Sequence, residues 1–147
     1  MQTIPFTKEQ YENLIKLAYL GEWMINSVRI DDTETAFDEL LGHVLSHAKG
    51  MGHDRYVEYD KQLEKYFPSE KLEEELHDYI EDYNNETFWD ELAGRLAERD
   101  LVKEYGMEKV ERMSFDERTE AEHPLIDKYY DEFERNGVDR IVIADGE

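Results

Sequence analysis

The sequence contains no cysteine. Disulfides, thiolate metal sites and thiol nucleophiles are therefore excluded, and the redox compartment cannot be inferred from cysteine usage. The chain also lacks any apolar run near the roughly 18 residues of a membrane span, and its start lacks the basic and apolar regions of a signal peptide. We therefore expect a cytoplasmic protein without a membrane partner.

Basic residues are scarce, with 17 Lys and Arg against 38 Asp and Glu, which gives a formal net charge of −21. Direct binding to nucleic acid or to anionic membranes is disfavoured, because both depend on Lys and Arg side chains that neutralise phosphates. A glycine-rich phosphate loop and a Gly-x-Ser-x-Gly nucleophile elbow are also missing. The 147 residues match the size of one ordinary domain, so we expect residues 1–147 to form a single helical domain.

Helical periodicity is clearest in residues 8–28, where Thr7 and Gln10 have the spacing of a capping box. Eight residues make one broad apolar face at 100° per residue: Tyr11, Leu14, Leu17, Ala18, Gly21, Met24, Ile25 and Val28. Three more large side chains lie on the other side of the same helix: Tyr19, Leu20 and Trp23. Because a helix with apolar residues over most of its girth must be covered on more than one side, these three are our candidate interface residues for a second subunit.

The remaining periodicity predicts an all-α, single-domain bundle of five or six helices. We expect the later helices at about residues 33–49, 56–67, 70–83, 86–105 and 124–136, with a break at Asn84 and Asn85 and a kink near Asp100. The segment from Arg140 to Ala144 has the one good strand signal. Its candidate partner is the extended N-terminal arm, residues 2–6.

Three of the five histidines, His43, His47 and His53, lie within eleven residues, and Asp54 follows the last of them. His43 and His47 are four residues apart on a predicted helix, the spacing at which two imidazoles can bind one metal ion. The alternative function that this cluster supports is a small metal-dependent enzyme. We expect no bound metal and no cofactor, because the helical wheel turns His43 toward water and no third ligand is fixed.

Residues 70–91 contain ten acidic residues and one basic residue, Lys71, a net charge of −9. Five of the acids make the predicted acidic surface of one helix: Glu70, Glu74, Asp78, Glu81 and Asp82. Carboxylates four residues apart lie about 6 Å apart along a helix axis, so a basic groove could bind them in place of a nucleic-acid backbone. A second alternative is therefore an acidic nucleic-acid mimic that inhibits a nucleic-acid-binding protein.

No residue pattern nominates a catalytic site. We therefore expect a non-enzymatic, acidic helical module that binds other proteins or regulates them, that self-associates as a homodimer, and that has a basic surface as its possible protein partner.

Overall fold

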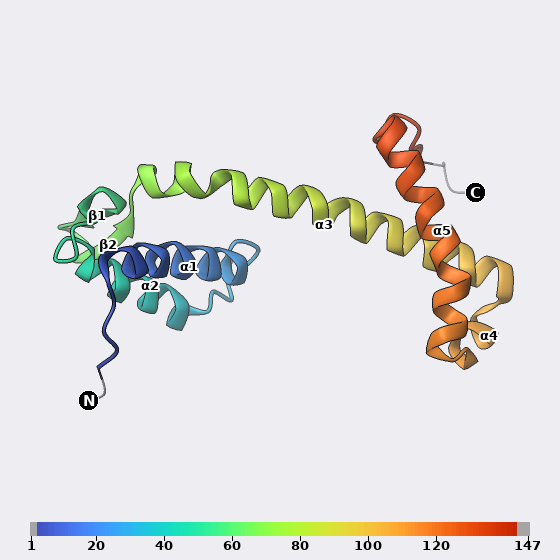
Figure 1. Ribbon diagram of the computed structural model, residues 1–147, viewed down its shortest axis with the longest axis horizontal. Helices are drawn as coiled ribbons and strands as arrows, with labels where there is room; N and C mark the ends of the chain where they lie inside the picture. Colours follow the sequence, from blue (N-terminus) through green and yellow to red (C-terminus); the bar gives the residue numbers. More distant parts are fainter. Residues whose placement is uncertain (1–2, 144–147) are drawn as a thin grey trace. The chain divides into compact units, whose positions relative to one another are not determined.

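The computed structural model describes residues 3–143 (Figure 1). Its elements in chain order are α1 (Lys8–Asn26), α2 (Thr35–Ala48), a 3₁₀ turn (Asp54–Tyr56), β1 (Val57–Asp60), β2 (Lys65–Pro68), α3 (Glu70–Tyr105), α4 (Met107–Arg112) and α5 (Phe115–Asn136). The mainly helical class is confirmed in this coarse form. The chain divides into two compact units, residues 1–81 (unit 1) and 82–147 (unit 2). The single domain expected from the length stays a prediction.

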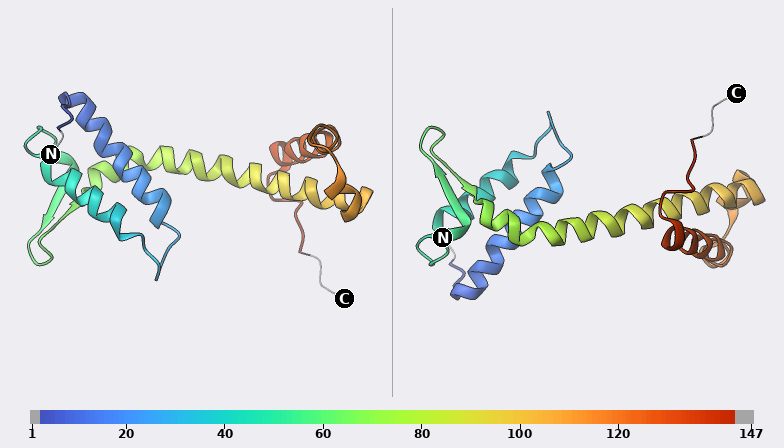
Figure 2. Two further views of the ribbon diagram at one scale, coloured as in Figure 1. Left: turned by 90° about the horizontal axis from the view of Figure 1, so that it is seen from below. Right: turned by 90° about the horizontal axis from the view of Figure 1, so that it is seen from above.

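Unit 1 is built on α1 and α2, which run side by side in every view (Figures 1 and 2). α1 begins at the predicted capping box, in which Thr7 Oγ1 accepts from the Gln10 amide and Gln10 Oε1 accepts from the Thr7 amide. Nine buried residues form the core of the unit: Tyr11, Ile15, Leu41, Val44, Leu45, Ala48, Tyr56, Leu72 and Leu76. Each large aliphatic side chain buried there contributes about 1.5–3 kcal/mol.

Residues 57–68 form an antiparallel hairpin, and the helix predicted for residues 56–67 is wrong. Tyr59 pairs with Tyr66 across the strands, and their ring centroids lie 4.7 Å apart. The turn has no glycine or Asn-Gly signal; Asp60 Oδ1 closes it by accepting from the amides of Gln62 and Leu63. A two-stranded ribbon is marginal alone, so its packing against α2 and the Lys65–Asp38 ion pair at 2.5 Å supply the stability that local sequence lacks.

α3 is one continuous helix from Glu70 to Tyr105. The predicted start is confirmed, since Ser69 Oγ accepts from the Leu72 amide at 3.3 Å. The predicted break at Asn84 and Asn85 is wrong, because an asparagine costs a helix interior only a few tenths of a kcal/mol and neither Gly nor Pro adjoins the pair. Gly106 ends α3 with a φ of 82°, which only glycine adopts without strain.

Unit 2 packs α5 across the C-terminal part of α3 (Figure 1). The final helix begins at Phe115, nine residues before the predicted start at Pro124, because Ser114 and Glu117 form a second capping box. It ends before Gly137, as predicted. The buried residues of the unit are Ala93, Ala97, Leu101, Val110 and Phe133, and the Trp89 ring lies 5.2 Å from the Phe133 ring.

The C-terminal strand is not confirmed. Residues 140–143 form a turn and an irregular segment, and Ala144 lies outside the described residues. The arm at residues 3–6 is extended but pairs with no strand in the described part of the chain, and Gln2 also lies outside it. None of the helices in residues 3–143 is both long enough and apolar enough to span a bilayer.

Candidate interaction surface

The charged residues of α1 all lie on one side of the helix. They are Lys8, Glu9, Glu12, Lys16 and Glu22, and they fall within an arc of about 140° that includes the buried Ile15. Seven uncharged residues occupy the opposite arc, which we call the α1 outer arc: Gln10, Asn13, Leu14, Leu17, Leu20, Gly21 and Met24. Two of the charged residues, Glu12 and Lys16, contact other elements of unit 1, whereas Lys8 and Glu9 are exposed.

Glu12 and Lys16 lie near the hydroxyl of Tyr56, a residue that is fully buried. This hydroxyl donates to Glu75 Oε2 at 2.6 Å and to Glu12 Oε1 at 2.9 Å, so its single proton is shared between two carboxylates. The Arg55 guanidinium donates to the same hydroxyl at 2.6 Å, and the Lys16 ammonium donates to Glu12 at 3.0 Å. Two acids and two bases thus neutralise each other around Tyr56. We call these five residues the Tyr56 network.

The network keeps both acids ionised. The Lys16 ammonium, followed by the Tyr56 hydroxyl, lowers the pKa of Glu12. The Tyr56 hydroxyl, followed by Lys16, lowers the pKa of Glu75. Burial, and then the hydrogen bonds to the two carboxylates, raises the pKa of Tyr56, so its hydroxyl keeps the proton that it donates. The network joins α1 to the first turns of α3, and it explains why Glu12 and Lys16 lie toward the rest of unit 1.

Glu75→Gln is expected to destabilise unit 1 at neutral pH but not in acid. Because folding lowers the pKa of Glu75 below its ordinary value of 4.5, its contribution is complete above that value and is lost as the pH falls through the lowered pKa. The difference in unfolding free energy between wild type and variant, measured by urea denaturation from pH 7 to pH 3, should therefore shrink below about pH 4.5. Glu74→Gln is the matched control, because Glu74 is 63% exposed against 27% for Glu75. A difference that stays constant with pH would contradict this role of the carboxylate.

Five of the seven residues of the α1 outer arc are exposed, whereas Leu14 and Leu20 are half-buried against the core. Leu17 is 68% exposed and Met24 is 53% exposed. The prediction that both are buried in the main apolar face is therefore wrong, although Tyr11 of the same face is buried and Leu14 and Ala18 pack against the core. Of the three candidate interface residues, Tyr19 and Leu20 pack against the core of the unit and Trp23 is half-buried. Their role in an interface stays a prediction.

α2 extends this apolar surface. Leu40 is 55% exposed, and Phe37, one helical turn before it, is also exposed. At the other end of the helix pair, a cavity of about 810 Å³ lies between the arm at residues 3–6 and the facing sides of α1 and α2. It is lined chiefly by apolar side chains, among them Ile4, Phe6, Leu14, Val44 and Met51.

The predicted histidine cluster is divided by the fold. His43 and His47 are exposed at the edge of that cavity, with ring centroids 5.0 Å apart. His53 is buried elsewhere, stacked between Tyr11 and Tyr56, and its Nε2 donates to the Lys8 carbonyl at 2.8 Å. Asp54 is exposed in the 3₁₀ turn. Within residues 3–143, no three His, Asp or Glu side chains are grouped as metal ligands.

The predicted acidic surface is exposed at all five positions. Glu70, Glu74, Asp78 and Glu81 lie in unit 1, and Asp82 is the first residue of unit 2. Glu74 has an ion pair with Lys71 at 3.7 Å, and Glu81 has one with His77 at 3.2 Å. Binding of a basic partner by this surface stays a prediction.

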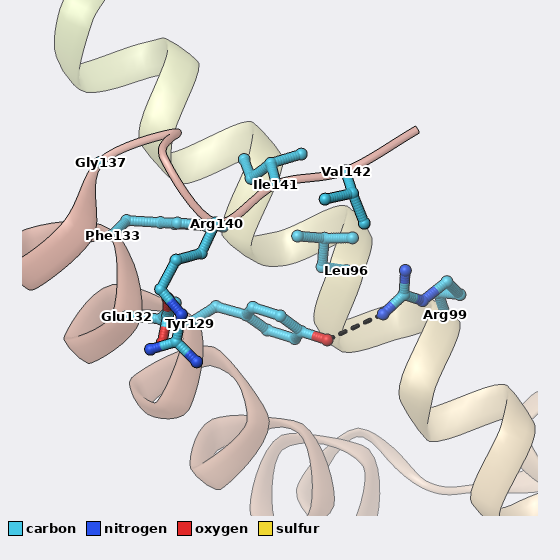
Figure 3. Close-up of a pocket in the computed structure, with 9 residues that line it drawn as sticks. All are labelled: Leu96, Arg99, Tyr129, Glu132, Phe133, Gly137, Arg140, Ile141 and Val142. Atoms are coloured by element: carbon cyan, nitrogen blue, oxygen red, sulfur yellow. Dashed lines mark hydrogen bonds and ion pairs between the residues drawn. The ribbon is translucent and has the colours of Figure 1, made fainter. Parts of the chain in front are cut away.

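Unit 2 has a smaller cavity of about 320 Å³, shown in Figure 3 between α3, α5 and residues 137–142. Two arginines line it. Arg99 donates to the Tyr129 hydroxyl at 2.9 Å and is paired with Asp100 at 2.8 Å, while Arg140 is paired with Glu132 at 3.2 Å. Since both guanidinium charges are already neutralised by acids of the same unit, this cavity is a weak candidate for binding an anion.

Comparisons of the chain with protein-family models, curated proteins and solved structures found no match.

Proposed function

We propose that this protein is a non-enzymatic, protein-binding module whose binding face is the α1 outer arc together with Phe37 and Leu40 of α2. The observation that carries the proposal is the absence of charge from a helical arc of seven residues, five of which are exposed. In this sequence 37% of the residues are charged, so an uncharged and largely apolar surface is unusual. Contiguous exposed apolar surface on a small protein marks a site of association.

The composition of the arc supports a protein partner. Leucine and methionine side chains provide flexible apolar contact area, and a methionine adapts its shape to the surface it meets. Asn13 and Gln10 place neutral hydrogen-bonding groups at the border of the arc, which resembles the polar rim that surrounds the apolar centre of protein interfaces. Solvent exposure of this surface costs free energy that a partner would recover at about 25 cal/mol per Å² of apolar area buried.

Site-specific photocrosslinking in cells of the native host tests the proposal. A photoreactive phenylalanine analogue at position 17 or 24 should form covalent adducts with a protein, a second copy of the chain included. The matched control is position 63, because Leu63 is 65% exposed, close to the 68% of Leu17, but lies in the β1–β2 turn. Adducts at positions 17 and 24 that are absent at position 63 support the binding face. Equal labelling at all three positions, or no adduct at any, would overturn it.

A further inference from the structure

We infer that the partner of the α1 outer arc is a second copy of this chain, with the two α1 helices packed antiparallel and Leu17 of each copy against Gly21 of the other. This inference rests on the proposed function, since it names the partner of the same face. Three features of unit 1 lead to it: the position of the charges on α1, the glycine within the arc, and the spacing of the residues on either side of it.

The charges permit a second copy only at this face. Two chains with a net charge of −21 repel each other, and the repulsion between exposed charges is screened only beyond about 8–10 Å at physiological salt. A helix with acids at its contact would place like charges directly opposite each other. Glu12 and Glu22 lie away from the outer arc, and Glu9 lies at its border beside Asn13. None of the four residues along the middle of the arc, Leu14, Leu17, Gly21 and Met24, is charged, so two copies of these residues meet without opposing charges.

Gly21 has no role inside unit 1 that requires glycine. A Cβ atom added at Gly21 would meet nothing within 4 Å, and the residue lies in the interior of a helix, where glycine costs about 1 kcal/mol relative to alanine. The missing side chain leaves a hole on the exposed surface of α1. A large side chain of a partner helix would fill this hole, and it would let the two backbones approach closely.

The side chain that fills this hole comes from the same arc of the second copy, because of how the residues of the arc are spaced. Leu14, Leu17, Gly21 and Met24 follow each other at intervals of three, four and three residues, the a and d positions of a heptad. When two such helices are placed antiparallel, Leu17 of one copy faces Gly21 of the other, and Leu14 faces Met24. Each layer then pairs a large residue with glycine, or leucine with methionine, and the face is complementary to itself about a twofold axis.

Because the chain has no cysteine, disulfide formation can test the register directly. The variants Leu17→Cys and Gly21→Cys are prepared separately, mixed at equal concentration and oxidised. The inferred register brings position 17 of one copy to position 21 of the other, within the 4.4–6.8 Å Cα separation that a disulfide requires. We expect the mixed 17–21 disulfide to form at least about tenfold faster than the 17–17 or 21–21 disulfide. Faster formation of the two symmetric disulfides, or equal rates for all three, would overturn the register.

Sedimentation equilibrium over a range of concentrations tests the dimer itself. Wild type should show a monomer–dimer equilibrium. Leu17→Glu should raise the dimer Kd at least about 100-fold, since it buries an unpaired charge. Leu63→Glu, at a position of similar exposure, should leave the Kd unchanged. Gly21→Leu should raise the Kd at least about tenfold by filling the hole, whereas Gly94→Leu should not, although a Cβ added at Gly94 also meets nothing within 4 Å. Circular dichroism should show that all four variants keep wild-type helix content.

A wild-type protein that is monomeric at all concentrations would overturn the second copy as partner. Photocrosslinking of positions 17 and 24 to a different protein would then leave the proposed function standing. If neither the dimer nor the crosslinks were found, both the second copy as partner and the proposed function would be overturned.

Discussion

Replacing Leu45 by alanine is expected to lower the unfolding free energy of unit 1 by about 2–5 kcal/mol. Leu45 is fully buried, so the substitution removes apolar contacts and leaves a cavity that the surrounding side chains fill only in part. Urea denaturation followed by tryptophan fluorescence measures the change. The measurement is made in a Trp89→Phe background, where Trp23 of unit 1 is the one remaining tryptophan.

Leu40→Ala is the control on the same helix. Because Leu40 is 55% exposed, its truncation should cost less than about 1 kcal/mol in the monomer. Comparing Leu45→Ala with Leu40→Ala distinguishes packing inside unit 1 from packing against a partner. Equal losses for the two variants at concentrations where the protein is monomeric would contradict the exposure of the α2 surface.

Replacing Tyr56 by phenylalanine is expected to lower the unfolding free energy of unit 1 by about 1–3 kcal/mol at neutral pH. The ring is retained, so the loss reports on the hydroxyl, whose removal takes a hydrogen bond from Glu12, Glu75 and Arg55 at once. These three groups are partly shielded from water, which makes their unmet hydrogen bonds costly. The measurement is the same denaturation experiment at pH 7.

Tyr59→Phe is the matched control, because Tyr59 is about half exposed in β1 and no hydrogen bond joins its hydroxyl to another described residue. Its effect should stay within about 0.5 kcal/mol. If Tyr56→Phe were as mild as this control, the Tyr56 network would not be what orients α1, and the inward placement of Glu12 and Lys16 would need another cause.

The starts of α1 and α3 and the ends of α3 and α5 were predictable, because their causes are local, whereas the start of α5 was missed although Ser114 caps it. Thr7, Ser69 and Ser114 cap helices through side-chain oxygens that accept from amides three residues later. The capping interaction is complete within four residues, so it can be recognised without knowledge of the fold. Gly106 and Gly137 end helices for an equally local reason, a positive φ.

The hairpin and the face buried by α1 were not predictable in this way. The hairpin depends on α2, which covers a ribbon whose turn lacks the usual residues. On α1, a helical wheel assigns the widest apolar arc to the core and the charges to water. The true arrangement is rotated about the helix axis: Tyr11, Leu14 and Ala18 of that arc pack in or against the core, whereas Leu17 and Met24 are exposed. Glu12 and Lys16 lie toward the rest of the unit because they are neutralised by the Tyr56 network, whose other members are 39 or more residues away in the sequence. The distribution of all five α1 charges over one arc was the available signal, but it does not say which side is inside.

The sequence by itself therefore determined the helical character of the chain, the caps of three helices and the excess of acid, since these follow from periodicity, local hydrogen bonding and composition. Only the tertiary structure decided which side of α1 faces solvent, that His53 is separated from His43 and His47, and that Gly21 lies over open space. Each of these depends on groups brought together from distant parts of the chain. The energy of a buried charge depends on its neighbours, so the position of the proposed binding face became visible only when Tyr56, Arg55 and Glu75 were found around Glu12 and Lys16 of α1.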